Sequence, residues 1–281
     1  MAAQPFDFDL VTRTPGPPLS RFVEAIWYAR GTVPYSETIN PTGSSLAVFV
    51  LGDPMLCGAF GDGRRPLRAE HGFFVGPHDR PMVNEPTGET IAVGIVSKAV
   101  GCQALFGVVP SHLRGQAHDL ETIWPAATFL RESLLTTDSK EAMLDMVEQY
   151  LAATLDTSTV GLERCEKAIE LLEVDPTRPI ADIAEDLGVS HGHLDRELTR
   201  IVGLTPRALA RLMRIRCLLQ NIDTYGSHEW GELVAKLGWT DQTHLLRDFE
   251  RHTGVTPADY IAAQQTSVPA ALSHAGFVPD Y

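Results

Sequence analysis

The strongest constraint on the fold of this chain is a string of residues that occurs twice. The first copy reads Ile180-Ala-Asp-Ile-Ala-Glu-Asp-Leu-Gly-Val-Ser, and the second reads Trp230-Gly-Glu-Leu-Val-Ala-Lys-Leu-Gly-Trp-Thr. Each copy then runs through a variable segment to Leu194 or Leu245, followed nine residues later by Gly-X-Thr-Pro. The offset between the copies is 50 residues before the variable segment and 51 residues after it, so the second copy holds one extra residue.

Each copy predicts two helices joined by a short turn. Gly188 and Gly238 stand where a first helix ends and a left-handed backbone conformation is needed. Ser190 and Thr240 are suitable N-caps for the second helix, which we expect over residues 191–202 and 243–252. Two helices joined by a turn of three or four residues form the helix-turn-helix unit, whose second helix enters the major groove of DNA.

Arginines occupy the same two places on both second helices. Stepping 100° per residue from Leu194 puts the apolar residues on the inner face and Arg196 and Arg200 on the outer face. The second copy places Arg247 and Arg251 there in the same way, 51 residues further on. Arginine can bind guanine with two hydrogen bonds or pair with a phosphate, so these faces are candidate DNA contacts. A solvated helix face is the alternative for each arginine singly, and a helical solenoid for the repeat.

The charge distribution favours a nucleic-acid partner even though the net charge of the 281-residue chain is −13. Residues 196–216 contain six arginines and a single acidic residue, Glu197. This window includes a predicted helix over 206–222, along which Arg207, Arg211 and Arg214 can follow the DNA backbone. Glu197 corresponds to Asp248 in the second copy, and this acid either holds an arginine or repels phosphate.

The duplicated region resembles the double helix-turn-helix domain of AraC/XylS-type transcriptional regulators. The string Gly238-Trp-Thr-Asp-Gln-Thr-His-Leu-Leu-Arg-Asp-Phe-Glu-Arg-His-Thr-Gly-Val-Thr-Pro-Ala-Asp-Tyr is similar to that family nearly throughout, except that Trp239 stands where Phe is usual. The resemblance implies that bases are read early in each second helix, by Gly192, Asp195 and Arg196 and by Gln242, Thr243 and Arg247. The full set of expected DNA contacts is Ser190, Gly192, His193, Asp195, Arg196, Thr199, Arg200, Thr240, Gln242, Thr243, His244, Arg247 and Arg251.

The N-terminal half is rich in predicted strands. Apolar, β-branched runs bounded by Gly, Pro and Asp lie at residues 45–52, 72–76 and 90–97 and predict a small barrel or sandwich. Apolar residues at helical spacing predict helices over 19–30, over 99–106, and as a pair within 126–155 that is broken near 136–139. The apolar stripe around 143–155 is our candidate for a dimer contact, with packing on its own barrel as the alternative.

A second resemblance concerns this half. Leu105-Phe-Gly-Val-Val-Pro-Ser-His-Leu, followed by Asp119-Leu-Glu-Thr-Ile-Trp, is similar to a string in the sensor domain of many such regulators. It implies an α+β protein: an N-terminal cupin-like β-barrel with flanking helices, and a C-terminal all-α domain with two helix-turn-helix units. We expect a ligand-sensing or dimerisation domain over 1–155, a linker over 156–161, a DNA-binding domain over 162–265 and a tail over 266–281.

Other constellations carry weaker signals. Gly58-x-x-Gly61-x-Gly63 lacks the dinucleotide spacing and favours a hairpin turn. His71 and His78 lack further ligands for a metal, no catalytic arrangement stands out, and we expect neither metal nor cofactor. Aromatic and basic residues that could surround an effector, or else form plain core and a solvated loop, are Trp27, Tyr35, Phe49, Phe60, Arg64, Arg68 and Phe73.

Together these patterns predict a cytoplasmic transcription regulator rather than an enzyme. The expected partners are double-stranded DNA, a small-molecule effector, a second copy of the chain in a homodimer and RNA polymerase. No apolar run reaches the roughly 18 residues of a membrane span, and the N-terminus has no secretory signal, so no membrane contact is expected. The competing class is an enzyme or small-molecule carrier whose helical half is an adaptor.

Overall fold

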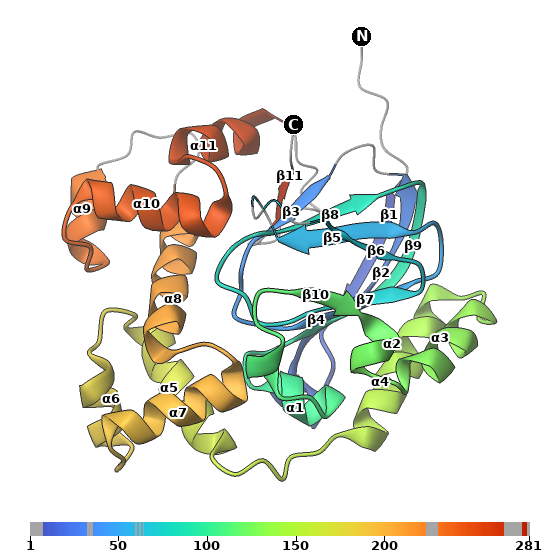
Figure 1. Ribbon diagram of the computed structural model, residues 1–281, viewed down its shortest axis with the longest axis horizontal. Helices are drawn as coiled ribbons and strands as arrows, with labels where there is room; N and C mark the ends of the chain where they lie inside the picture. The colour runs from blue at the N-terminus through green and yellow to red at the C-terminus, as the bar shows by residue number, and fades with distance from the viewer. Residues whose placement is uncertain are drawn as a thin grey trace.

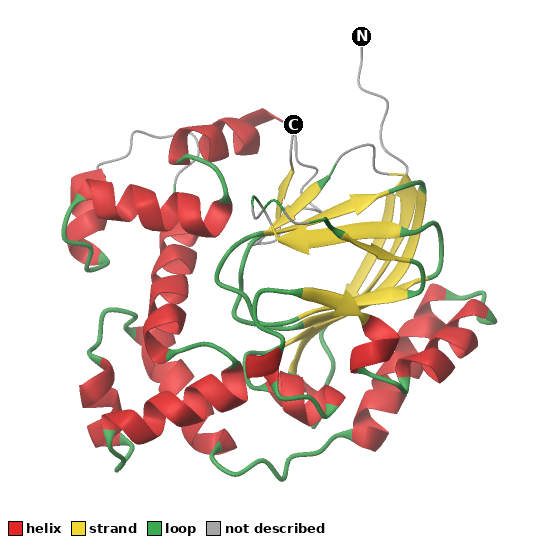
Figure 2. Ribbon diagram, in the orientation of Figure 1, coloured by secondary structure: helices red, strands yellow, loops and turns green. Residues whose placement is uncertain are grey.

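The computed structural model describes residues 8–32, 36–59, 61, 63, 65–222, 230–266 and 277–279. A strand-rich N-terminal half and a helical C-terminal half lie beside each other (Figures 1 and 2). We call the strand-rich half, with the helices that follow its strands, the sensor half, after the role that is expected from its sequence. In the helical half, α8 runs between a pair of helices that includes α7 and a pair that includes α10 (Figure 1).

The sensor half contains two antiparallel sheets. The first has the strand order β1 (Phe8–Arg13), β2 (Val23–Thr32), β9 (Glu89–Ser97), β4 (Leu46–Val50), β7 (Gly72–Val75) and β10 (Ala117–Asp119). The second has the order β11 (Phe277–Pro279), β3 (Glu37–Ile39), β8 (Met82–Pro86), β5 (Met55–Ala59) and β6 (Leu67–Ala69). β11 comes from the far C-terminus and pairs antiparallel with β3.

The six-stranded sheet is the middle layer of this half, and it is buried on both faces. Val48 and Phe73 pack with residues of the second sheet, whereas their neighbours Phe49 and Phe74 pack with the helices. A strand that is buried on both faces needs apolar residues at every position rather than at every second one. This explains the continuous apolar runs from which three strands were predicted, and it confirms those strands.

The β-rich fold class is confirmed, with a correction to its closure. Among the described strands, none of the hydrogen-bonded pairs links the first sheet to the second, so the sheets face each other without closing into a barrel. The apolar cluster around Val48, Met55 and Phe73 fills the space between them. The arrangement is that of two facing sheets, with which a cupin-like fold is compatible.

The predicted helix over 19–30 is wrong. Only Leu19–Arg21 forms a single 3₁₀ turn, and β2 follows as a long strand between β1 and β9. A β-bulge between Val23 and Ala25 inserts one residue, so that Val23 and Ile26 are both buried. A bulge shifts the alternation of a strand by one position, and the resulting three-residue spacing imitates a helix.

Four helices cover the outer face of the middle sheet: α1 (Gly101–Phe106), α2 (Leu120–Ile123), α3 (Ala127–Leu135) and α4 (Lys140–Thr154). Trp124 joins them to the sheet, with its ring centroid 5.9 Å from that of Phe49, 5.1 Å from Phe106 and 5.8 Å from Tyr150. The string that ends at Trp124, which is similar to a string in the sensor domain of many AraC/XylS-type regulators, therefore packs the helices against the middle sheet. The stripe of α4, including Val147, is buried in the same cluster and so packs within its own chain.

The helical half follows the predicted order closely. Its helices are α5 (Leu162–Val174), α6 (Ile180–Asp186), α7 (His191–Val202), α8 (Pro206–Asn221), α9 (Trp230–Lys236), α10 (Gln242–Thr253) and α11 (Pro257–Thr266). α4 ends at Thr154 and α5 begins at Leu162, which leaves the predicted linker without helix or strand. No helix in the described part of the chain is long and apolar enough to cross a membrane.

The hydrophobic core does not divide where the linker does. One continuous cluster runs from the helix-covered face of the middle sheet into α5, α6, α7 and the first half of α8, as far as Met213. A separate cluster joins Ile215 and Leu218 in the second half of α8 to α9 and α10. The first helix-turn-helix unit, α6 and α7, is thus fused to the sensor half, whereas the second unit, α9 and α10, has a core of its own.

Candidate nucleic-acid interface

The two units repeat the same backbone turn. Gly188 has φ +67° and Gly238 has φ +72°, the left-handed conformation that glycine adopts at low cost. The next residue in each unit closes the turn, because Val189 N donates to Ala184 O and Trp239 N donates to Val234 O, each over 3.0 Å. The glycines therefore act as predicted, as the exits of the first helices.

The extra residue of the second copy lies between this turn and the second helix. Ser190 caps α7, where its hydroxyl accepts from His193 N at 3.3 Å. In α10 the cap is Asp241, whose carboxylate accepts from His244 N at 2.7 Å, and not Thr240 as predicted. Ser190 and Asp241 both stand four residues before the first inward leucine of their helix. Counting back from that leucine would have identified the cap from the sequence.

The outer faces of α7 and α10 are open over their first two turns. In α7, Ser190, Gly192 and Arg196 are exposed, whereas His193, Asp195 and Thr199 are half-buried. In α10 the exposed set is continuous and comprises Thr240, Gln242, Thr243, His244 and Arg247. Arg196 and Arg247 thus point outward at equivalent positions, in agreement with the helical-wheel prediction.

Glu197 and Asp248 lie beneath these faces and hold arginines in place. Each is buried, and each forms an ion pair with an arginine on the helix that precedes its unit: Arg164 NH1 lies 3.3 Å from Glu197, and Arg211 Nε lies 3.5 Å from Asp248. The sequence had left open whether these acids repel phosphate. Because their oxygens face arginines within the protein, the holding role accounts for them.

A histidine one turn earlier joins each buried carboxylate. His193 Nε2 lies 3.2 Å from Glu197, and His244 Nε2 lies 3.7 Å from Asp248. In the second unit, Trp239 Nε1 also donates to Asp248 at 3.0 Å. Phenylalanine, the usual residue at position 239 in the family that this region resembles, could not make that hydrogen bond. The departure at Trp239 thus provides a donor for a buried charge.

Two arginines of the basic window are used inside the protein. Arg211 pairs with Asp248, and Arg214 donates to Gly238 O at 3.2 Å with its guanidinium 5.6 Å from the Trp239 ring centroid. Burial lowers the pKa of Arg214. The expectation that both lie along the DNA backbone needs correction, because their side chains stabilise the second unit. Arg207 is exposed and remains available for DNA.

The third turns of both recognition helices carry arginines that bind elements outside their own units. Arg200 NH2 donates to the carbonyl of Val160 in the linker at 2.6 Å. Arg251 NH2 donates to Asp79 of the sensor half at 2.9 Å. These two predicted DNA contacts are therefore engaged within the chain. Asp79 was not singled out from the sequence, which contains no pattern that links residue 79 to residue 251.

The candidate effector residues of the sensor half do not converge. Phe49 packs toward the helices, whereas Phe73 lies between the sheets, on the opposite face of the middle sheet. Trp27 packs beside the inter-sheet cluster, and Arg68 is exposed and pairs with Glu70 at 2.7 Å. Tyr35, Phe60 and Arg64 lie outside the described residues.

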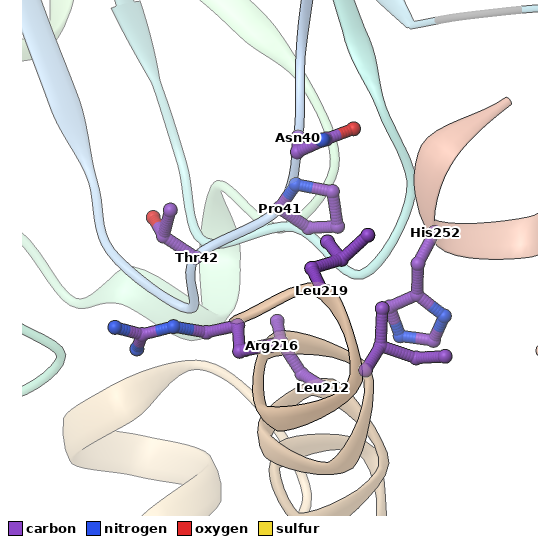
Figure 3. Close-up of a pocket in the computed structure, with 8 residues that line it drawn as sticks. Asn40, Pro41, Thr42, Leu212, Arg216, Leu219 and His252 are labelled. Carbon is purple, nitrogen blue, oxygen red and sulfur yellow. The ribbon is translucent and has the colours of Figure 1, made fainter. Parts of the chain in front are cut away.

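A small cavity of about 20 Å³ lies between the two halves (Figure 3). Asn40, Pro41 and Thr42 line one side, and α8 and His252 line the other. Within the described chain, the side-chain amide of Asn40 and Nε2 of His252 are buried without a hydrogen-bond partner. A volume of this size accommodates about one water molecule, which could satisfy these atoms. Burial also lowers the pKa of His252.

Comparison with known proteins supports this description of the two halves. Residues 183–263 match the model of a helix-turn-helix domain family, and residues 11–119 match a domain of unknown function, DUF6597. A search of curated proteins found no match. The helical half is thus a DNA-binding helix-turn-helix domain. The match agrees with the resemblance of this region to the helix-turn-helix domain of AraC/XylS-type regulators.

Two structures of one protein resemble the chain over most of its length, and a third structure resembles about a third of it. A structure of ToxT from Vibrio cholerae is 14% identical, with a TM-score of 0.45, over 91% of this chain and 98% of that one. A ToxT structure with bound unsaturated fatty acid is 15% identical, with a TM-score of 0.44, over 80% of this chain and 90% of that one. A probable AraC family regulator from Rhodopseudomonas palustris is 21% identical, with a TM-score of 0.32, over 36% of this chain and 95% of that one.

Proposed function

We propose that the chain regulates transcription by placing α7 and α10 in successive major grooves on one face of a DNA duplex. The observation that carries this proposal is the pair of open faces on which Arg196 and Arg247 occupy equivalent positions. An arginine at the edge of a major groove recognises guanine through O6 and N7, and the other exposed polar residues extend the contact. Exposed Arg207, between the helices, adds a phosphate contact.

The two helices differ in how well they can read bases. In α10, Gln242 and Thr243 are exposed beside Arg247, and glutamine pairs well with adenine. In α7, the corresponding early positions hold Gly192, which has no side chain, and half-buried Asp195, a carboxylate that accepts hydrogen bonds, for example from cytosine N4, but cannot donate to guanine. We infer that α10 supplies most of the sequence discrimination and that α7 mainly anchors the complex.

The test compares Arg196→Ala and Arg247→Ala with Arg68→Ala, an exposed arginine of the sensor half. The probe is a duplex selected from random-sequence DNA with the 281-residue chain. Losing one bidentate base contact costs about 1–3 kcal/mol, so each of the first two variants should bind about 5- to 150-fold more weakly. Arg68→Ala should bind like the parent. Sequence-specific binding that survives both recognition-helix substitutions would show that the groove assignment is wrong.

Ionic strength provides an independent test of the same assignment. Phosphate contacts by arginine release counterions, so the affinity should fall steeply as salt is raised. The measurement is the logarithmic slope of the dissociation constant of the selected duplex between 50 and 200 mM salt, a range over which roughly 10³–10⁵-fold losses accompany six to ten phosphate contacts. A flat response would contradict the basic surface.

We also propose that a small molecule bound by the sensor half changes the arrangement of the two units. The shared core supports this mechanism, since a rearrangement at the middle sheet can reach α7 through packed side chains. A thermal-shift screen of small molecules should use the full chain, because the first unit and the sensor half share that core. A homodimer, contact with RNA polymerase and a cytoplasmic location remain parts of this proposal, and sedimentation would test the first.

A further inference from the structure

The carboxylate of Asp79 joins the sensor half to the second recognition helix. It accepts from Arg251 NH2 at 2.9 Å and faces Arg114 NH2 at 3.4 Å. The side chain of Asp79 is 15% exposed, and that of Arg251 is 36% exposed. A pair that is screened in this way from water is worth more than an open surface ion pair. It is therefore a contact with energetic consequences for the position of α10.

The second unit depends on such a contact more than the first unit does. α7 is held on the sensor half by a continuous apolar core, and its C-cap Gly203 packs so tightly on Pro77 and Pro110 that a Cβ there would clash with Pro77. The core of α9 and α10 is instead a separate cluster around Phe249 and the second half of α8. Within the described chain, the hydrogen bond between Arg251 and Asp79 ties α10 to the sensor half, and the small cavity near His252 lies between the same two parts.

Arg251 also belongs to the surface that faces DNA in the proposed function. It lies one turn beyond Arg247 on α10, at the position that corresponds to Arg200 in α7. A guanidinium that donates to a carboxylate at 2.9 Å cannot use the same N–H groups for a phosphate. Asp79 thus occupies one donor of Arg251 and holds its guanidinium against the sensor half, away from a DNA phosphate.

We propose that Asp79 is a positioning residue that competes with DNA for Arg251 and so holds the second unit in a docked, lower-affinity arrangement. This inference rests on the proposed function, because it needs α10 to bind DNA. Since binding is reciprocal, a change in the sensor half that draws Asp79 toward Arg114 raises the affinity of α10 for DNA, and DNA binding loosens Arg251 from the sensor half.

The test is a double-mutant cycle on the full chain with Asp79→Asn, Arg251→Gln and the double variant, and with a selected duplex as probe. Asp79→Asn should tighten DNA binding about 3- to 10-fold, because Arg251 is released. In the Arg251→Gln background the same change should alter DNA binding less than about twofold, because the guanidinium for which Asp79 and DNA compete is gone. Equal tightening in both backgrounds would show plain removal of a negative charge and overturn the proposal, as would no tightening in the parent background.

Two controls keep this outcome specific. Glu70→Gln removes an exposed charge from the same half and should leave DNA binding unchanged. Arg114→Gln leaves Arg251 as the arginine partner of Asp79 and should weaken DNA binding or leave it unchanged. Tighter DNA binding would contradict the proposed role of Asp79. Hydrogen exchange without DNA should rise in α10 of Asp79→Asn and stay constant in α7. If the parent chain binds no selected duplex, the proposed function fails. If it binds and the cycle shows no coupling between Asp79 and Arg251, only the proposed role of Asp79 fails.

Discussion

The two helix-turn-helix units share a backbone but differ in what surrounds them. In both, a left-handed glycine, a capped recognition helix and a buried carboxylate with an arginine partner occur in the same order. The first unit shares its core with the sensor half, and the second has a separate core and one ion pair to Asp79. Sequence repetition therefore fixes local structure without fixing function. In the proposed function, the first unit anchors the complex, and the second reads most of the sequence.

Matched leucines offer the largest test of this difference. Leu194 and Leu245 occupy the same position and are both fully buried, and replacing either by Ala should cost about 2–5 kcal/mol of local stability. Because the core of Leu194 continues into the sensor half, Leu194→Ala should raise hydrogen exchange in α1 as well as in α7. Leu245→Ala should raise it in α9 and α10 alone. If Leu245→Ala also raised hydrogen exchange in the sensor half, as Leu194→Ala should, the distinction between a shared and a separate core would be wrong.

Base-substitution scanning of a selected site would sharpen the functional side of the comparison. Substitutions under α10 should cost about 1–3 kcal/mol per base pair, in line with the exposed Gln242, Thr243 and Arg247. Substitutions under α7 should cost less, apart from the base pair read by Arg196, because Gly192 offers no side chain. Competition binding with single-substitution duplexes measures both. A larger penalty under α7 would reverse the assignment of reader and anchor.

The helix caps should show a smaller and more even effect. Ser190→Ala and Asp241→Ala each remove the acceptor for a first-turn N–H and should cost about 1 kcal/mol of stability. Thr240→Ala should cost less, since Thr240 does not cap α10. Chemical denaturation of the three variants gives the comparison. A loss at Thr240 as large as that at Asp241 would restore the cap predicted from the sequence.

A gradual pH effect is expected at the contact between the second unit and the sensor half. Burial lowers the pKa of His252 and of His78, which precedes Asp79. The unfolded chain then binds more protons than the folded chain below the ordinary histidine pKa of about 6.5, so the free energy of unfolding should fall as the pH drops below that value. Denaturation at pH 7.5 and pH 5.5 measures the loss, and it should shrink in His252→Gln. The charged groups that act on these rings are Asp79, the buried Asp248 and Arg211.

At Asp79 itself, burial alone would raise the pKa, but hydrogen bonding from Arg251 and the charges of Arg114 and Arg251 lower it overall. The stabilising contribution of this carboxylate is present above its ordinary value of about 3.9 and is lost as the pH falls through the lower folded value. The docking contact therefore survives the histidine range and fails only in stronger acid.

Much of the secondary structure of this protein follows from its local sequence. Gly188, Gly238 and the Thr-Pro pairs predicted the helix boundaries of the second half, because capping and left-handed glycine depend on neighbours a few residues away. The equivalence of Arg196 and Arg247 followed from the period of a helix. The apolar runs predicted three strands, since a strand buried on both faces shows no alternation.

Tertiary structure decided the features that join distant residues. The bulge in β2 gave a strand the apolar spacing of a helix. One continuous core joins the two sides of the predicted linker, so the linker does not separate two hydrophobic cores. Arg211, Arg214 and Arg251 looked alike in the sequence, yet Arg211 pairs with Asp248, Arg214 donates to Gly238 O in the turn of the second unit, and Arg251 binds Asp79. Local rules state which side chains leave a helix, but the partner that meets each one is set by packing between segments as far apart as residues 79 and 251.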